Sequence, residues 1–142
     1  MIPTGDSYDD SDVDMTEDME ESVIPTKTYR INAESKSIQG FVDAADALQQ
    51  AIYKIIRTEV ETYPIYSDNY GVYIEDLIGE NPAYATAMVK HRLEEAILMD
   101  DRFESVTFDN ENYTDGKLSL DITVGIADDS KAINLEGVTI DV

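Results

Sequence analysis

The 142-residue sequence predicts an α+β fold, in which an N-terminal hairpin and two main helices precede C-terminal antiparallel strands packed on the helices. Apolar residues recur at helical spacing in two separate stretches of the chain. In a later stretch apolar and polar residues alternate strictly, which is typical of a strand with one buried face. No linker is long enough to divide residues 26–142 into two folded domains.

The folded part is expected to open with a hairpin. Residues 28–31 and 37–41 have extended patterns, and turn-forming residues lie between them. A helix is predicted over residues 43–58, because Asp43 can cap its N-terminus and apolar side chains then recur at helical spacing. Its predicted buried positions are Ala45, Leu48, Ile52, Ile55 and Ile56.

Four tyrosines follow at intervals of three, four and three residues: Tyr63, Tyr66, Tyr70 and Tyr73. Pro64 and Gly71 argue against a helix there, so we expect an ordered loop over residues 62–73. Two interpretations stay open. The phenol rings pack on the edge of the core, or they contact a partner, since tyrosine offers a large contact area at low entropic cost.

A second helix is predicted to begin after Asn81, with Pro82 in its first position, and to end near Asp100. A short helical turn over residues 74–78, stopped by Gly79, precedes it. The predicted buried face of the second helix holds Ala85, Val89, Leu93, Ala96 and Ile97.

Three extended segments complete the chain, at residues 103–113, 117–127 and 132–142. The dipeptide Asp115-Gly116 between the first two is a hairpin signal. The middle segment alternates most strictly, and its inward positions are Leu118, Leu120, Ile122, Val124 and Ile126.

In the last segment the alternation of apolar and polar residues shifts by one position. Its apolar residues are odd-numbered at Ile133 and Leu135 but even-numbered at Val138 and Ile140. Successive side chains of a strand point to opposite faces, so the sequence predicts a bulge or a break at Glu136-Gly137.

The chain carries 31 acidic residues against 10 Lys and Arg, a formal net charge of -21. Such a charge repels nucleic-acid phosphates and anionic lipid headgroups, so we expect a soluble protein with no direct nucleic-acid or membrane partner. Residues 1–25 hold nine of the acids and no Lys or Arg. We expect this acidic tail to be disordered or to fold on a partner.

Part of the tail matches a calcium loop. Asp10, Asp12, Asp14 and Glu21 fall at ligand positions of an EF-hand. Met15 stands where that loop needs glycine for its sharp turn, so calcium binding is not expected.

The sequence contains few residues in patterns typical of an active site. The chain has no cysteine and one histidine, His91, and its glycines never cluster into a phosphate-binding loop. We therefore expect no metal, no cofactor and no enzymatic activity. A hydrolase with two catalytic carboxyl groups needs a fixed distance between them and a raised pKa at one of them. The only candidates for such a pair are Glu59, Glu61, Glu75 and Glu80.

Three segments carry a resemblance to a known family. They are ALQQAIYKI at residues 47–55, YPIYSDNYG at residues 63–71 and EDLIG at residues 75–79. In this order and spacing they resemble the baseplate wedge proteins of PBSX-like prophages, contractile-tailed phages and phage-tail-like bacteriocins. More distantly, the chain is similar to the short wedge component of contractile injection systems that carries the label acidic lysozyme.

The resemblance implies a structural subunit of the inner baseplate around the tail tube, assembled in the bacterial cytoplasm and carried in the phage or bacteriocin particle. Its helices would join larger wedge proteins, and its strands would template the first ring of sheath protein by strand exchange. The implied wedge-facing residues are Tyr63, Pro64, Tyr66, Tyr70, Gly71, Tyr73 and Leu77. The implied sheath-facing residues are Val138, Thr139, Ile140, Asp141 and Val142.

Two other functions remain open from the sequence. The label acidic lysozyme suggests a cell-wall hydrolase. The acidic tail suggests an adaptor that holds a basic partner through residues 1–25 in a salt-sensitive way. A terminal strand such as 138–142 offers an edge for strand addition, but it can equally well complete its own sheet.

Overall fold

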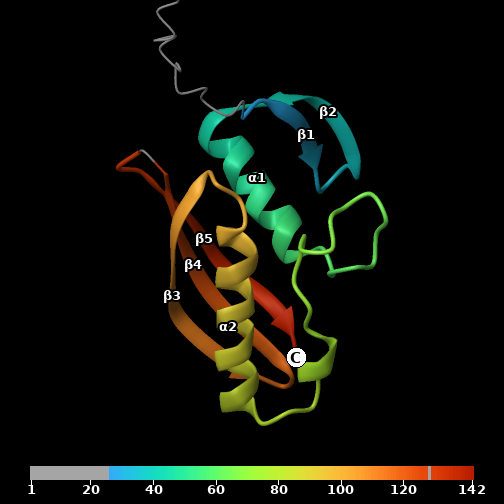
Figure 1. Ribbon diagram of the computed structural model, residues 1–142, viewed down its shortest axis with the longest axis vertical. Helices are drawn as coiled ribbons and strands as arrows, with labels where there is room; N and C mark the ends of the chain where they lie inside the picture. Colours follow the sequence, from blue (N-terminus) through green and yellow to red (C-terminus); the bar gives the residue numbers. More distant parts are fainter. Residues whose placement is uncertain (1–25, 128) are drawn as a thin grey trace, which may run out of the picture.

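The computed structural model describes residues 26–127 and 129–142 and confirms the α+β fold (Figure 1). The elements are β1 (Thr28–Asn32), β2 (Ser37–Val42), α1 (Ala44–Ile56), the 3-10 turn η1 (Glu75–Leu77), α2 (Pro82–Leu98), β3 (Phe103–Thr114), β4 (Lys117–Ile126) and β5 (Ala132–Asp141). The acidic tail and its calcium-loop positions lie outside the described residues.

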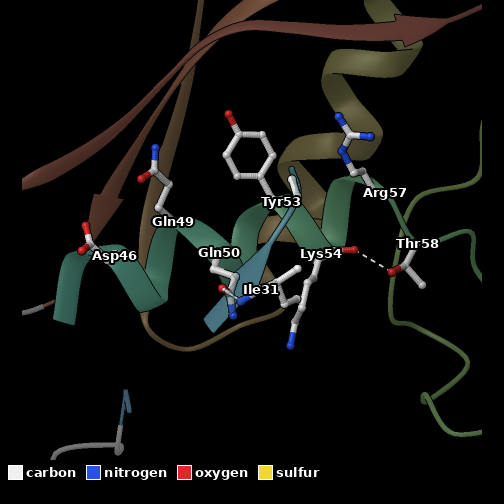
Figure 2. Close-up of a pocket in the computed structure, with 9 residues that line it drawn as sticks. Ile31, Asp46, Gln49, Gln50, Tyr53, Lys54, Arg57 and Thr58 are labelled. Atoms are coloured by element: carbon white, nitrogen blue, oxygen red, sulfur yellow. Dashed lines mark hydrogen bonds between the residues drawn. The ribbon is translucent and has the colours of Figure 1, made fainter. Parts of the chain in front are cut away.

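The hairpin of β1 and β2 is held against α1 by one side chain. The Gln50 amide donates to the Tyr29 carbonyl (2.7 Å) and accepts from the Ile31 N–H (2.9 Å), so it occupies the edge of β1 as a neighbouring strand would. Figure 2 shows Ile31 close to Gln50 and Lys54 of α1. Asp43 caps α1 as predicted, because its carboxylate accepts from the Ala44 N–H (2.7 Å).

The buried face of α1 differs from the prediction at three residues. Ala45 is exposed and Ile56 is half-buried, whereas Ala47, outside the predicted set, is buried together with Leu48, Ile52 and Ile55. Ala45 lies in the first turn, where no strand or helix covers it, and helical spacing alone does not reveal where the covering elements end.

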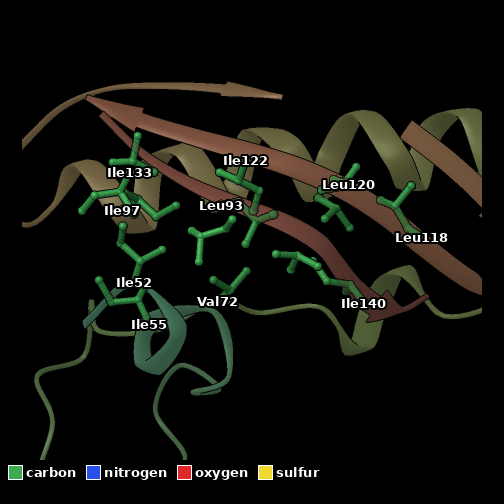
Figure 3. Packing of buried hydrophobic residues seen from close by; sticks show 14 of the residues in the cluster. Ile52, Ile55, Val72, Leu93, Ile97, Leu118, Leu120, Ile122, Ile133 and Ile140 are labelled. Carbon is green, nitrogen blue, oxygen red and sulfur yellow. The ribbon is translucent and has the colours of Figure 1, made fainter. Parts of the chain in front are cut away.

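The core fills the space between α1, α2 and one face of the sheet (Figure 3). The sheet has the order β3-β4-β5, and both pairs are antiparallel. α2 presents a stripe of four fully buried residues at intervals of four: Ala85, Val89, Leu93 and Ile97. Ala96, also predicted to be buried, is half-buried at the rim of this stripe.

The predicted bulge in β5 is confirmed. Leu120 of β4 pairs with Val138 and Ile122 pairs with Leu135, so two residues of β5 lie opposite Asp121. Gly137 adopts φ +62, a conformation that side chains disfavour. The extra residue keeps Ile133, Leu135, Val138 and Ile140 on the buried face despite the change of phase.

Asp121 joins this bulge to an irregularity in β3. Its carboxylate accepts from the Gly137 N–H (2.8 Å) and from the Asn110 side-chain amide (2.7 Å). Asn110 has φ +50 and lies where the register of β3 shifts between Asp109 and Asn112. One side chain of the central strand therefore holds both edge strands at their irregular positions.

The hydrogen bond from Asn110, and then that from Gly137, lower the pKa of Asp121 below its ordinary value. A carboxyl whose pKa is lower in the folded than in the unfolded chain stabilises the fold above the unfolded-state pKa. That stabilisation disappears as the pH falls through the folded-state pKa.

We predict that Asp121→Asn lowers the free energy of unfolding at pH 6, because an amide presents one acceptor where the carboxylate presents two. The difference from wild type should shrink between pH 6 and pH 3, because the unfolded chain takes up its proton near pH 3.8 while the folded carboxylate stays ionised to a lower pH. Urea unfolding followed by circular dichroism across this range measures it. Asp101→Asn, at an exposed position, is the matched control. An equal loss for Asp121→Asn at pH 6 and pH 3 would contradict the role of the ionised carboxylate.

Candidate functional site

The tyrosine-rich loop leaves and re-enters the fold at a single point. The Thr58 carbonyl accepts from the Val72 N–H (2.8 Å), which closes the loop of residues 59–71. Gly71 is buried with φ +107, and a Cβ there would overlap the Thr58 carbonyl oxygen. The loop therefore has a fixed base, and Figure 1 shows it projecting beside the end of α1.

The rings of three tyrosines form a row from the core to the outside of the loop. Tyr70 is half-buried against the core and stacks on Tyr66, with 4.4 Å between ring centroids. Tyr66 meets Tyr63 edge to face at 6.4 Å. Burial, followed by the nearby Tyr66 and Asp100, raises the pKa of the Tyr70 phenol. Tyr63 is 53% exposed and Ile65 is 84% exposed, so the outer end of the row meets solvent.

The core-packing interpretation holds for part of the loop, and the partner interpretation stays a prediction. Tyr70 packs on the core, and Leu77 in η1, after the loop, is fully buried in the core. Tyr63, Pro64, Tyr66 and Tyr73 are exposed. These four positions are therefore accessible, and the stacking of Tyr66 on Tyr70 links the exposed part of the loop to the core.

Arg92 of α2 fixes the segment that follows the loop. Its guanidinium binds the Asp76 carboxylate through two hydrogen bonds (2.5 and 2.8 Å) and donates to the Tyr73 carbonyl (2.7 Å). It also lies 5.7 Å from the centroid of the Tyr73 ring. The hydrogen bonds from Arg92 lower the pKa of Asp76. The sequence analysis does not single out Arg92, since a pair 16 residues apart leaves no local signal.

The second predicted surface, the terminal strand, completes its own sheet and also forms an edge. Val138, Ile140 and Val142 are buried, and the Val142 N–H donates to the Gly116 carbonyl (2.8 Å). Backbone groups alternate in direction along an antiparallel strand, so the N–H groups of Thr139 and Asp141 point away from β4. Within the described part of the chain, no strand pairs with this outer edge of β5.

The opposite edge of the sheet is less regular. β3 has two register shifts along its length, and Asn110 adopts a positive φ. Lys90 of α2 forms an ion pair with Glu111 of β3 (2.6 Å). Bulges and charges of this kind hinder the addition of a further strand. β5 therefore offers the better edge for pairing.

Of the four candidates for catalysis, Glu59 and Glu75 line one pocket on the surface, next to Asp141. Glu61, Glu75 and Glu80 are exposed and Glu59 is half-buried, whereas a hydrolase keeps one carboxyl protonated in an apolar pocket. His91 lies on the surface, 3.2 Å from Glu95. Among the described residues, no group of three or more His, Asp or Glu side chains is placed to hold a metal ion. None of the described helices is long and apolar enough to cross a membrane.

The described part of the chain thus combines an α+β fold with a partly exposed aromatic loop and an unpaired sheet edge that contains one bulge. The chain belongs to the contractile injection system sheath initiator family, whose model matches residues 24–130. It is also similar to the phage-like element PBSX protein XkdS of Bacillus subtilis strain 168. The two are 33% identical over 95 residues, which cover 63% of this chain and 67% of that protein.

We predict that Gly71→Ala destabilises the fold by about 2 kcal/mol or more, from the disfavoured backbone conformation and the overlap with Thr58. Chemical denaturation measures the loss. Gly79→Ala is the matched control, because Gly79 also has a positive φ but no atom within 4 Å of a built Cβ. Equal losses for the two variants would show that the close approach to Thr58 contributes nothing.

We predict that the tyrosines of the row differ sharply in their effect on stability. Tyr70→Ala should cost about 2–3 kcal/mol, because it removes a half-buried ring from the core edge. Tyr63→Ala should change the free energy of unfolding by no more than about 0.5 kcal/mol, because its ring is largely solvated. Urea denaturation of both variants tests this, and a similar large loss for Tyr63→Ala would mean that the whole row is part of the core.

Proposed function

We propose that this chain is a non-enzymatic subunit of the inner baseplate that starts the sheath by accepting a strand of the first sheath ring on the outer edge of β5. The observation that carries the proposal is the outer edge of β5, whose Thr139 and Asp141 N–H groups point away from β4. Membership of the sheath initiator family supports the sheath protein as the partner.

The burial of β5 decides the form that strand exchange takes. Val138, Ile140 and Val142 contact the core, and each buried side chain of this size contributes about 1.5–3 kcal/mol. Release of β5 into another sheet would lose that contribution, whereas addition of a strand to its free edge keeps it. We therefore propose that the sheath donates the strand and that residues 138–142 receive it.

The loop surface supplies the second contact of the proposal. Tyr63, Pro64, Tyr66 and Tyr73 present rings to solvent from a base fixed at Thr58 and Arg92. Aromatic side chains on a rigid support are typical anchors of protein interfaces. We propose that this surface binds the larger wedge proteins around the tail tube. Neither the hydrolase nor the adaptor alternative is favoured by a specific observation in the described residues.

We predict that Thr139→Pro abolishes normal sheath assembly. Proline has no backbone N–H, and the Thr139 N–H points away from β4. The substitution therefore removes a hydrogen bond to an incoming strand but leaves the hydrogen bonds between β5 and β4 in place. The variant replaces the wild-type gene in cells that produce the whole particle, and electron microscopy counts the baseplates that carry a sheath. The expected result is bare baseplates and sheath polymerised elsewhere.

Thr139→Ala is the matched control, since it keeps the N–H and should support normal sheaths. Recovery of the larger wedge proteins with the tagged Thr139→Pro chain would show that the variant still folds and enters baseplates. Normal sheaths on Thr139→Pro baseplates would contradict strand addition at β5.

A further inference from the structure

The positive charge of the chain is concentrated in the hairpin and α1. Residues 26–58 hold five Lys and Arg against three acidic residues, whereas residues 59–142 hold five against nineteen. In the second part Lys90, Arg92, Arg102 and Lys117 each form an ion pair. The five cations of residues 26–58 are Lys27, Arg30, Lys36, Lys54 and Arg57. Among the described residues, none of them forms an ion pair with a carboxylate.

One of these cations, Lys27, lies beside the most exposed apolar side chains of the hairpin. Tyr29 stacks on Phe41 with 5.0 Å between centroids, and the Lys27 ammonium lies 5.1 Å from the Phe41 ring. Tyr29, Ile31, Ile38 and Phe41 are each between 49% and 67% exposed. Direct pairing of Tyr29 with Phe41 and of Ile31 with Ile38 places all four on one face. We call this face, together with Lys27, the hairpin surface. Arg30 and Lys36 add two further positive charges to the hairpin.

A groove extends the hairpin surface onto α1. It has a volume of about 700 Å³, and its lining includes Ile31 of β1 and residues of the α1 region, with Lys54 and Arg57 at one end and the acidic Asp46 at the other (Figure 2). An exposed apolar face next to such a groove, rimmed by these cations, suits an extended segment that alternates acidic and apolar residues.

We propose that the acidic tail of the same chain, residues 6–21, docks on the hairpin surface. The tail carries nine carboxylates and no cation, and Tyr8, Val13, Met15 and Met19 are interspersed among the acids. Charge and apolar character therefore match on the two sides.

The position of the tail makes this contact favourable. The tail leads directly into Thr26, whose hydroxyl binds Asp43 and accepts from the Ala44 N–H (3.2 Å) at the start of α1. Eight extended residues span about 26 Å, enough to cross a five-residue strand. A segment joined so closely to its site acts at a millimolar effective concentration.

A spin label tests the proposal in the full chain. The chain has no cysteine, so Ser11→Cys provides a unique site for a nitroxide within the acidic segment. Paramagnetic broadening of backbone amide signals then reports which residues the tail visits. At 50 mM NaCl we expect the strongest broadening at residues 27–42, falling by about threefold or more at 500 mM as exposed charges are screened.

A variant with Lys27, Arg30 and Lys36 changed to Gln should show a similar fall at low salt. The matched control changes Lys90, Lys117 and Lys131 to Gln, which removes the same charge elsewhere and should leave the broadening intact. Broadening at the hairpin that responds neither to salt nor to the hairpin variant would reflect the tether alone and overturn the proposal. The strongest broadening on another surface would also overturn it. The salt titration uses the unaltered hairpin, so it tests the docking even if the triple variant unfolds locally.

Discussion

The hydrogen bonds of Asp121 to both edge strands are the interaction on which the rest of the structure depends. The apolar side chains of β5 change from odd to even numbers at Glu136 and Gly137, so a regular ladder would bury one half of the strand and expose the other. The bulge absorbs the extra residue, and the Asp121 carboxylate binds the freed Gly137 N–H. Because of this bulge, the apolar side chains of both halves of β5 face the core.

This constraint also shapes the surfaces offered to partners. With Val138, Ile140 and Val142 anchored in the core, β5 cannot leave without loss of packing, and its outer edge presents a fixed set of backbone groups. The loop follows the same principle, since Gly71 and Arg92 hold its base while Tyr63 and Tyr66 remain exposed. Both surfaces are thus preorganised, which would lower the entropic cost of the binding proposed for them.

Local sequence patterns predicted the elements well, because periodicity and caps act over a few residues. Asp43 and Pro82 marked the helix starts, and the phase change marked the bulge at Gly137. What the patterns missed depends on contacts distant in sequence. The exposure of Ala45, the pairing of Arg92 with Asp76 and the role of Asn110 opposite Asp121 each arise only when separate elements pack together. The loop tyrosines divided between core and surface for the same reason.

The most direct test of strand addition is an electron cryomicroscopy map of the assembled particle at the junction between baseplate and sheath. Our account predicts a strand of the first sheath ring hydrogen-bonded to the outer edge of β5 beside Thr139 and Asp141, with β5 still paired to β4. A junction in which this edge faces solvent, or in which β5 has left its sheet, would contradict it.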